Sequence, residues 1–284
     1  MSTAELASAP GTTRRRRRTR SRRALGMGSA LGLGITMIWF SLLVLIPLVA
    51  VLIAAADLGL AGFWDVVSSP QTAAALRLTV VQALGVTLLN VVMGTALAWV
   101  LVRDHFWGKR LLDVVIDVPF ALPTIVAGLV LLSLYGPNSP LGVNVANTKV
   151  AVFLALAFVT LPFVVRTVQP VLETLERDTE EAAASLGASR FTTFRRVILP
   201  SLTPAIAAGA ALSFARGISE YGSLVLLSGN LPGRTEVASV RVLTYIENGS
   251  KEAAAAVAAI LLLVALLVIV ALDVLQRRLA RRGD

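Results

Sequence analysis

Long stretches without charged residues dominate the chain. Residues 24–56, 78–102, 118–148 and 253–272 contain no Asp, Glu, Lys or Arg, and two further apolar stretches include or adjoin isolated charges. A helix crosses about 30 Å of hydrocarbon with roughly 20 apolar residues. The pattern therefore predicts an all-α integral membrane protein with six transmembrane helices, at 33–56, 79–102, 115–135, 150–169, 202–227 and 253–273.

Basic residues are concentrated at the two ends of the chain. Eight arginines lie between Arg14 and Arg23, and four lie between Arg277 and Arg282. Cytoplasmic segments of membrane proteins are enriched in Lys and Arg, so both termini are predicted to be cytoplasmic. Six helices in this orientation leave 20 basic residues inside, with Arg166 counted at the inner interface, and five outside. We expect residues 1–30 to form a basic disordered tail beside anionic lipid and residues 31–284 to form the transmembrane domain.

The composition indicates a membrane protein that catalyses no reaction. The 284 residues are 56% hydrophobic and 15% charged, with no Cys, a single His at His105 and a mean hydropathy of +0.78. These values exclude a soluble enzyme, and they leave no zinc cluster and no Ser-His-Asp triad. Gly108-Lys109 lacks the upstream glycine of a P-loop, so we expect neither an ATP site nor a cofactor in this chain. The pI of about 11.1 suggests nucleic acid, but arginines placed beside apolar helices favour lipid instead.

The longest predicted cytoplasmic loop contains the signal of a short helix. Asp178 is suited to cap a helix of about two turns, and Gly187 suits the left-handed position after its C-terminus. Between them lie Ala182–Ala184, which are small enough for the backbone to sit closely in a groove of another protein. A second amphipathic segment, Arg190–Leu199, is expected to return to the membrane and to stop at Pro200. From spacing alone, an ordinary interfacial turn explains the pattern equally well.

One spaced motif in this loop is more specific. It reads Glu181-Ala182-Ala183, three residues, Gly187, nine residues, and then Val197-x-Leu199-Pro200. With Val in place of the usual Ile, it resembles the signature loop of the permease subunits of bacterial ABC importers. The resemblance implies that the loop at 171–200 couples the chain to a separate ATPase subunit, through Glu181, Ala182, Ala183, Gly187, Leu199 and Pro200.

The same resemblance implies a fold and a set of partners. The fold would be that of a type I ABC importer permease (MetI-like), with six transmembrane helices in a bacterial cytoplasmic (inner) membrane. Its expected partners are a second permease subunit in a heterodimer, a dimer of subunits that bind ATP, and an external substrate-binding protein. No nucleic acid partner is expected.

The likeness extends from about residue 111 to residue 247 and narrows the range of expected substrates. Segments 113–124, 161–170 and 213–222 are similar to the CysT-type sulfate/thiosulfate permeases. Molybdate permeases share parts of these motifs, so molybdate or another oxyanion remains an alternative. A self-sufficient six-helix channel or secondary carrier is a further alternative, but such a carrier favours a carboxylate relay or inverted repeats. A membrane enzyme is least favoured, because clusters of His, Cys or carboxylates are missing from the sequence.

Arg216 is the candidate residue of an anion pathway. It falls near the middle of the predicted fifth span, where an arginine costs about 2.5 to 3.5 kcal/mol even on lenient insertion scales. Glu220, at i+4, is positioned to pair with it and to leave guanidinium donors free for an oxyanion. Asn90 has a similar predicted depth and offers an amide donor. The alternative is that Arg216 and Glu220 form a packing pair that never meets substrate.

Two prolines mark the start of the predicted third span. Pro119 and Pro123 lie four residues apart, after Asp117 and before Thr124, and they remove backbone donors from one helix face. We expect a break or kink there, and broken helices at membrane depth are normally buried or line a cavity. This segment is therefore a candidate gate, with a static kink as the alternative.

Overall fold

The computed structural model describes residues 27–175 and 177–280, which are mainly helical. The chain divides into two units, Met1–Leu48 and Val49–Asp284. Most of the predicted basic tail, residues 1–26, lies outside the described residues. Helix α1 begins at Met27, within the uncharged stretch that starts at residue 24, so residues 27–30 are helical.

The first unit contains a continuous apolar helical segment. It comprises α1 (Met27–Phe40), the π-helical turn η1 (Ser41–Leu45) and the start of α2 (Ile46–Ala56), which continues into the second unit. Residues Leu31–Ala56 are long and apolar enough to cross a membrane, in agreement with the predicted first span. The π-helical turn directly precedes the Ile46-Pro47 pair. Proline lacks a donor and crowds the preceding turn of an α-helix, and a wider turn relieves that crowding.

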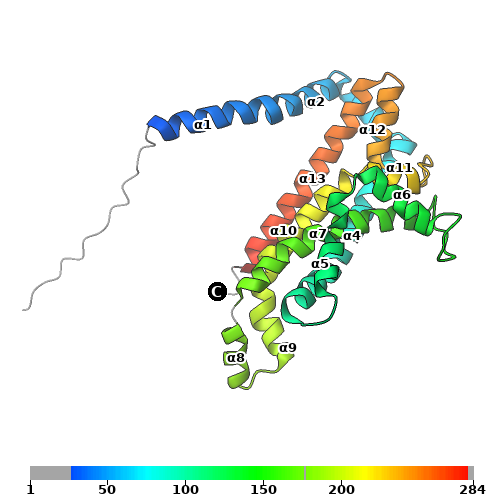
Figure 1. The fold of residues 1–284 in the computed structure, drawn as a ribbon. Coiled ribbons are helices and arrows are strands. Elements are labelled where there is room, and N and C mark those ends of the chain that lie inside the picture. Colours follow the sequence, from blue (N-terminus) through cyan, green and yellow to red (C-terminus); the bar gives the residue numbers. More distant parts are fainter. Residues whose placement is uncertain (1–26, 176, 281–284) are drawn as a thin grey trace, which may run out of the picture. The chain divides into compact units, whose positions relative to one another are not determined.

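The second unit is a helical bundle whose two ends carry different short elements. Figure 1 shows α8 and α9 at one end, and α6, α11 and α12 towards the other. We call these the α8 end and the α12 end. The elements are α3 (Gly59–Ser68), α4 (Pro70–Arg103), α5 (Lys109–Ala121), α6 (Thr124–Tyr135), α7 (Lys149–Thr174), α8 (Arg177–Ser185), α9 (Arg190–Thr193), η2 (Phe194–Ile198), α10 (Leu199–Ile218), α11 (Gly222–Leu227), α12 (Ala238–Glu247) and α13 (Lys251–Ala280).

The lengths of the helices agree with most of the predicted spans. Within the described residues, five helical segments are long and apolar enough to cross a membrane, or six if the bent pair α5 and α6 forms one span. The spans predicted at 79–102, 150–169 and 253–273 lie within α4, α7 and α13. The span predicted at 202–227 was wrong at its C-terminal boundary, because α10 ends at Ile218 and α11 is a separate helix.

Helices α4, α7 and α10 pack closely through small residues. A Cβ added at Gly94 of α4 would lie 2.8 Å from Cβ of Val164 in α7, and one added at Gly209 of α10 would lie 2.3 Å from Oγ1 of Thr167. Close approach at small residues is the usual basis of helix association in membranes, where lipid gives no hydrophobic driving force between helices. These contacts make the three helices the core against which the remaining elements are placed.

Candidate functional site

The prolines of α5 and α6 produce the predicted break. α5 accommodates Pro119 and ends at Ala121, after which Leu122 and Pro123 are extended, with ψ of 135° and 134°. A proline disfavours the helical conformation of the residue before it, which explains the extended Leu122. α6 begins at Thr124, and the axes of α5 and α6 differ by 118°. The break therefore follows from local sequence, and Pro123 is its cause.

A second break separates α10 from α11 and contains the predicted ion pair. Nη2 of Arg216 lies 2.6 Å from Oε2 of Glu220, and the backbone N–H of Ser223 donates to Oε1 of Glu220 at 2.9 Å. The Glu220 side chain is fully buried, whereas that of Arg216 is 28% exposed. Arg216 lies in the last turn of α10, and not in the middle of a span as predicted. The Glu220 carboxylate binds the first turn of α11, so it supports the break that the apolar pattern did not reveal.

The two breaks meet. A Cβ added at Gly222, the first residue of α11, would lie 2.1 Å from Oγ1 of Thr124 and 2.9 Å from the backbone nitrogen of Ile125. A Cβ added at Gly128 of α6 would lie 2.7 Å from the carbonyl oxygen of Ser223. Backbone therefore touches backbone where α6 and α11 begin, and glycine is required at both positions. The fold thus brings the predicted residues Pro123 and Thr124 to the segment that follows Glu220.

Asn90 lies elsewhere, in the packing of the core. It is 1% exposed, and its Nδ2 donates to Oγ1 of Thr160 at 2.8 Å and to Oγ of Ser213 at 3.5 Å. These bonds join α4 to α7 and α10. Because the amide nitrogen is already engaged, its geometry favours helix packing over contact with a substrate.

The coupling loop has the predicted helix, with a different start. Helix α8 begins at Arg177, so Asp178 lies inside the first turn and does not precede the helix; its side chain is outside the described residues. Gly187 has a φ of +83°, the left-handed conformation predicted for it. The N–H of Ala188 donates to the carbonyl of Ala183 at 3.0 Å, as in a Schellman motif. Glu181 and Ala182 are exposed on α8 and are available to another protein.

The segment after α8 does not stop at Pro200 as predicted. Ser189 caps α9, and the helical path continues through η2 into α10, so that Arg190–Ile218 forms one helical segment. The π-helical turn η2 ends at Ile198, directly before Leu199 and Pro200, both of which are exposed. As at Pro47, the wider turn accommodates the proline ring without ending the helix.

Sequence reasoning missed an arginine clamp at the α8 end. Arg166 of α7, which was counted at the inner interface, binds two carboxylates of α5. Its Nε and Nη2 donate to Asp117 at 2.7 Å each, and its Nη1 donates to Asp113 at 2.7 Å. The i, i+4 spacing of the two aspartates places them on one helix face, which was the available signal. The clamp holds α5, and with it the break at Pro123, against α7.

Another polar cluster lies at the α12 end. The hydroxyls of Thr72 in α4 and Tyr245 in α12 are hydrogen-bonded at 3.0 Å, and Nη2 of Arg241 donates to the Tyr245 hydroxyl at 3.3 Å. Nη1 of Arg241 lies 3.9 Å from Oε1 of Glu236. Burial raises the pKa of Glu236, and the charge of Arg241 opposes that shift. The cluster ties the N-terminal end of α4 to α12.

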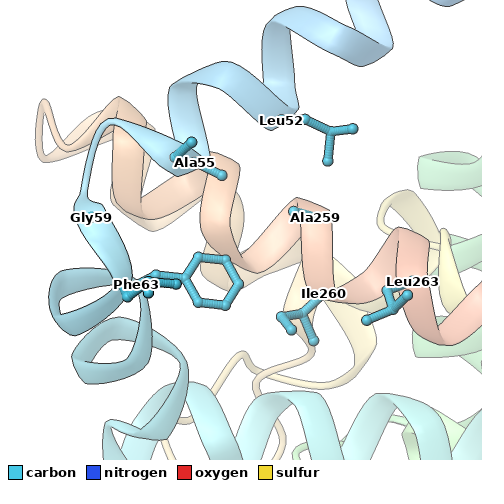
Figure 2. A pocket seen from close by; sticks show the side chains of 9 residues that line it. Leu52, Ala55, Gly59, Phe63, Ala259, Ile260 and Leu263 are labelled. Carbon is cyan, nitrogen blue, oxygen red and sulfur yellow. The ribbon is translucent and has the colours of Figure 1, made fainter.

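The described residues also form an apolar pocket, shown in Figure 2. It has a volume of about 530 Å³ and lies between the end of α2, α3 and α13. Phe63 and the side chains of α13 face it, and all of its lining residues are apolar or glycine. The pocket therefore offers no donor to an anion, and the candidate anion site remains at the two meeting breaks.

Comparison with known proteins places the chain in a transport family. Residues 90–282 match the family described as binding-protein-dependent transport system inner membrane component. The sulfate transport system permease protein CysT of Synechocystis is 44% identical over 249 residues, covering 85% of this chain and 87% of the relative. The protein of the same description from Salmonella typhimurium is 42% identical and covers 87% of this chain and 92% of the relative.

Solved structures agree at the level of the fold. A chain of a bacterial alginate ABC transporter, crystallised with a periplasmic protein that holds an alginate pentasaccharide, aligns with a TM-score of 0.72 at 17% identity. The alignment covers 88% of this chain and 94% of that one. An amino acid ABC transporter aligns with a TM-score of 0.53 at 20% identity, over 74% of this chain and 94% of that one. The chain therefore belongs to the family of inner membrane components of binding-protein-dependent transport systems, and it has the fold of an ABC transporter permease.

Proposed function

We propose that this chain is a permease subunit of an ATP-driven ABC importer for sulfate and thiosulfate. The observation that carries the proposal is 41–44% identity to CysT sulfate permease proteins over 85–87% of this chain. The chain supplies part of the membrane path and couples it to a separate ATPase, so it is not an enzyme by itself. ATP binds to the partner subunit.

The charge distribution supports one orientation of this subunit. Placing both termini and α8 in the cytoplasm leaves 20 Lys and Arg residues on that side and five on the other. In this orientation, α8 and the exposed side chain of Glu181 face an ATPase dimer. The α12 end faces an external substrate-binding protein, and a second permease subunit completes the path across a bacterial inner membrane.

The meeting breaks are the proposed substrate path. Arg216 is partly exposed, and only its Nη2 binds the Glu220 carboxylate in the described ion pair, so other guanidinium donors remain for an oxyanion. Pairing with a fully buried carboxylate also tempers the positive charge, which favours release of a dianion. Thr124, Pro123 and Pro119 belong to the facing break, where a change in the bend between α5 and α6 would open or close the path.

Uptake of radiolabelled sulfate tests the function. The chain is expressed with its partner permease, ATPase and binding protein in a bacterial strain that lacks its own sulfate permease, with excess thiosulfate or molybdate as competitor. We expect uptake that needs the ATPase and that thiosulfate inhibits. Uptake of molybdate in preference to sulfate would indicate a permease for another oxyanion, the substrate that the shared motif near Arg216 also allows. Uptake that persists without the ATPase would indicate a channel or secondary carrier.

A further inference from the structure

Arg103, the last residue of α4, lies where several segments of the α8 end meet. Its Nη2 donates to the carbonyl oxygen of Leu175 at 3.3 Å and to Oε1 of Glu180 at 2.5 Å. Leu175 directly follows α7, and Glu180 belongs to α8. One nitrogen of Arg103 therefore binds both the residue that follows α7 and a residue of α8. The side chain of Arg103 is 11% exposed and that of Glu180 is 27% exposed, so water screens this ion pair less than a surface pair.

Aromatic side chains hold the guanidinium in place. The Arg103 guanidinium carbon lies 5.9 Å from the centre of the Trp99 ring, and the Trp99 ring contacts that of Phe194 edge to face at 5.7 Å. Trp99, Leu175 and Phe194 all pack against one buried cluster, most of whose residues belong to α4, α7 and α10. The attraction between the guanidinium and the indole ring stabilises this one position of a side chain that is otherwise flexible. Arg103 is thus anchored in the rigid part of the bundle.

Helix α8 needs such an anchor because its connections are not helical. Leu175 has an extended ψ of 108° after α7, and Gly187 turns the chain after α8 with a φ of +83°. Few-residue connections that leave the helical conformation are the places where hinges absorb motion. Without a side-chain link, a displacement of α8 would be absorbed at these two connections.

We infer that Arg103 is a positioning residue that fixes α8 to α4, so that movement of α8 is passed to α4. The inference rests on the proposed coupling of α8 to an ATPase. α4 has 34 residues and is about 50 Å long at 1.5 Å per residue. Far along this helix, Oγ1 of Thr79 accepts the N–H of Ala238, and Thr72 binds Tyr245. α4 therefore reaches from the α8 end to the elements of the α12 end.

A double-mutant cycle in the reconstituted importer tests the inference. Arg103→Gln, Glu180→Gln and the double variant are assembled with both permeases, the ATPase and the binding protein in proteoliposomes. The measured quantity is substrate taken up per ATP hydrolysed, with complex yield and melting temperature recorded beside it. We expect each single variant to lower this ratio by about fivefold, the lower end of typical coupling between sites. The double variant should be no worse than Arg103→Gln, since the bond between Arg103 and Glu180 is already lost in that single variant.

Arg277→Gln is the matched control. Arg277 pairs with Asp273 at 2.9 Å in α13, but the two side chains are 72% and 48% exposed, and such pairs contribute little. We expect it to leave the ratio of uptake to ATP hydrolysis unchanged. Arg103→Lys keeps the charge without the planar fork and should recover part of the loss.

Other results would overturn the inference. One such result is an unchanged ratio of uptake to ATP hydrolysis in Arg103→Gln. Another is a loss in the double variant that equals the sum of the two single losses. A third is a fall of uptake and ATP hydrolysis in the same proportion as the yield of complex. If Arg103→Gln does not assemble, Glu180→Gln decides, because Glu180 belongs to the short helix α8 and its side chain is more exposed than that of Arg103, 27% against 11%. Failure of the proposed coupling itself is distinguished by Gly187→Val: normal transport in that variant overturns the coupling role of α8. A transport defect in Gly187→Val beside a normal Arg103→Gln overturns only the role of Arg103.

Discussion

At the scale of single residues, the question is whether the ion pair of Arg216 and Glu220 binds substrate in the path or only packs the helices. The Glu220 side chain is fully buried, and it is held by the guanidinium at 2.6 Å and by the N–H of Ser223 at 2.9 Å. Removing one partner of a buried ion pair costs about 3 to 5 kcal/mol, because the other charge is left uncompensated. A single substitution of Arg216 therefore changes both the site and the stability of the break.

A paired design separates these two effects. Arg216→Gln removes the cation but leaves the buried carboxylate, whereas Arg216→Gln combined with Glu220→Gln removes both charges and keeps an acceptor for Ser223. We expect the double variant to assemble normally and still to lose at least about tenfold in sulfate uptake, as a lost charge-assisted hydrogen bond implies. The measurements are the yield of complex, its basal ATP hydrolysis and its uptake of labelled sulfate. Restored uptake in the double variant would show that the pair serves packing alone.

At the scale of elements, the conformation of Gly187 sets the end of α8. Its φ of +83° is one that residues with a Cβ rarely adopt, yet among the described residues no atom beyond its chain neighbours lies within 4 Å of where a Cβ would be. A side chain introduced there strains the backbone conformation but clashes with no neighbouring residue that the structure describes. The effect is therefore confined to the direction of the chain between α8 and α9, with no direct damage to the core.

Gly187→Val is expected to cost more than about 1 kcal/mol locally and to misdirect α8. The variant should insert in the membrane at normal abundance but lose association with the ATPase and lose uptake. Co-purification of the ATPase with the tagged permease measures the association. Gly249→Val is the matched control, since Gly249 has a φ of +79° and equally open surroundings between α12 and α13. Normal transport by Gly187→Val would contradict the coupling role of α8.

At the scale of the whole molecule, the proposed orientation places α8 in the cytoplasm and the 136–147 loop outside. Asn138 in that loop and Ser185 at the end of α8 are both exposed, and the chain has no cysteine of its own. Single Asn138→Cys and Ser185→Cys variants therefore report the two sides without background labelling. A membrane-impermeant maleimide applied to spheroplasts should label Cys at 138 readily, and Cys at 185 only after lysis. The reverse pattern would contradict the orientation and, with it, the assignment of α8 to the ATPase side.

The sequence by itself determined those features that have local causes. The approximate positions of most spans follow from apolar length, because each stretch of backbone must satisfy its own hydrogen bonds in lipid. The extended Leu122 follows from Pro123 alone, and the left-handed Gly187 follows from the end of a short helix. The Arg216–Glu220 pair is also local, since the two residues are four positions apart.

Only the tertiary structure decided which distant residues meet. Arg166 binds aspartates 49 and 53 positions away, and Arg103 reaches Glu180 across 77 positions. The end of α10 at Ile218 also escaped prediction, because α11 packs its backbone on α6 at Gly222, a contact that the largely apolar pattern of residues 202–227 does not show. The sequence likewise predicted the depth of Asn90 but not its neighbours. The structure identifies Thr160 and Ser213 as its hydrogen-bond partners. Apolar patterning shows that a helix is in the membrane, whereas its neighbours are set by shape and by buried polar groups that find partners on other helices.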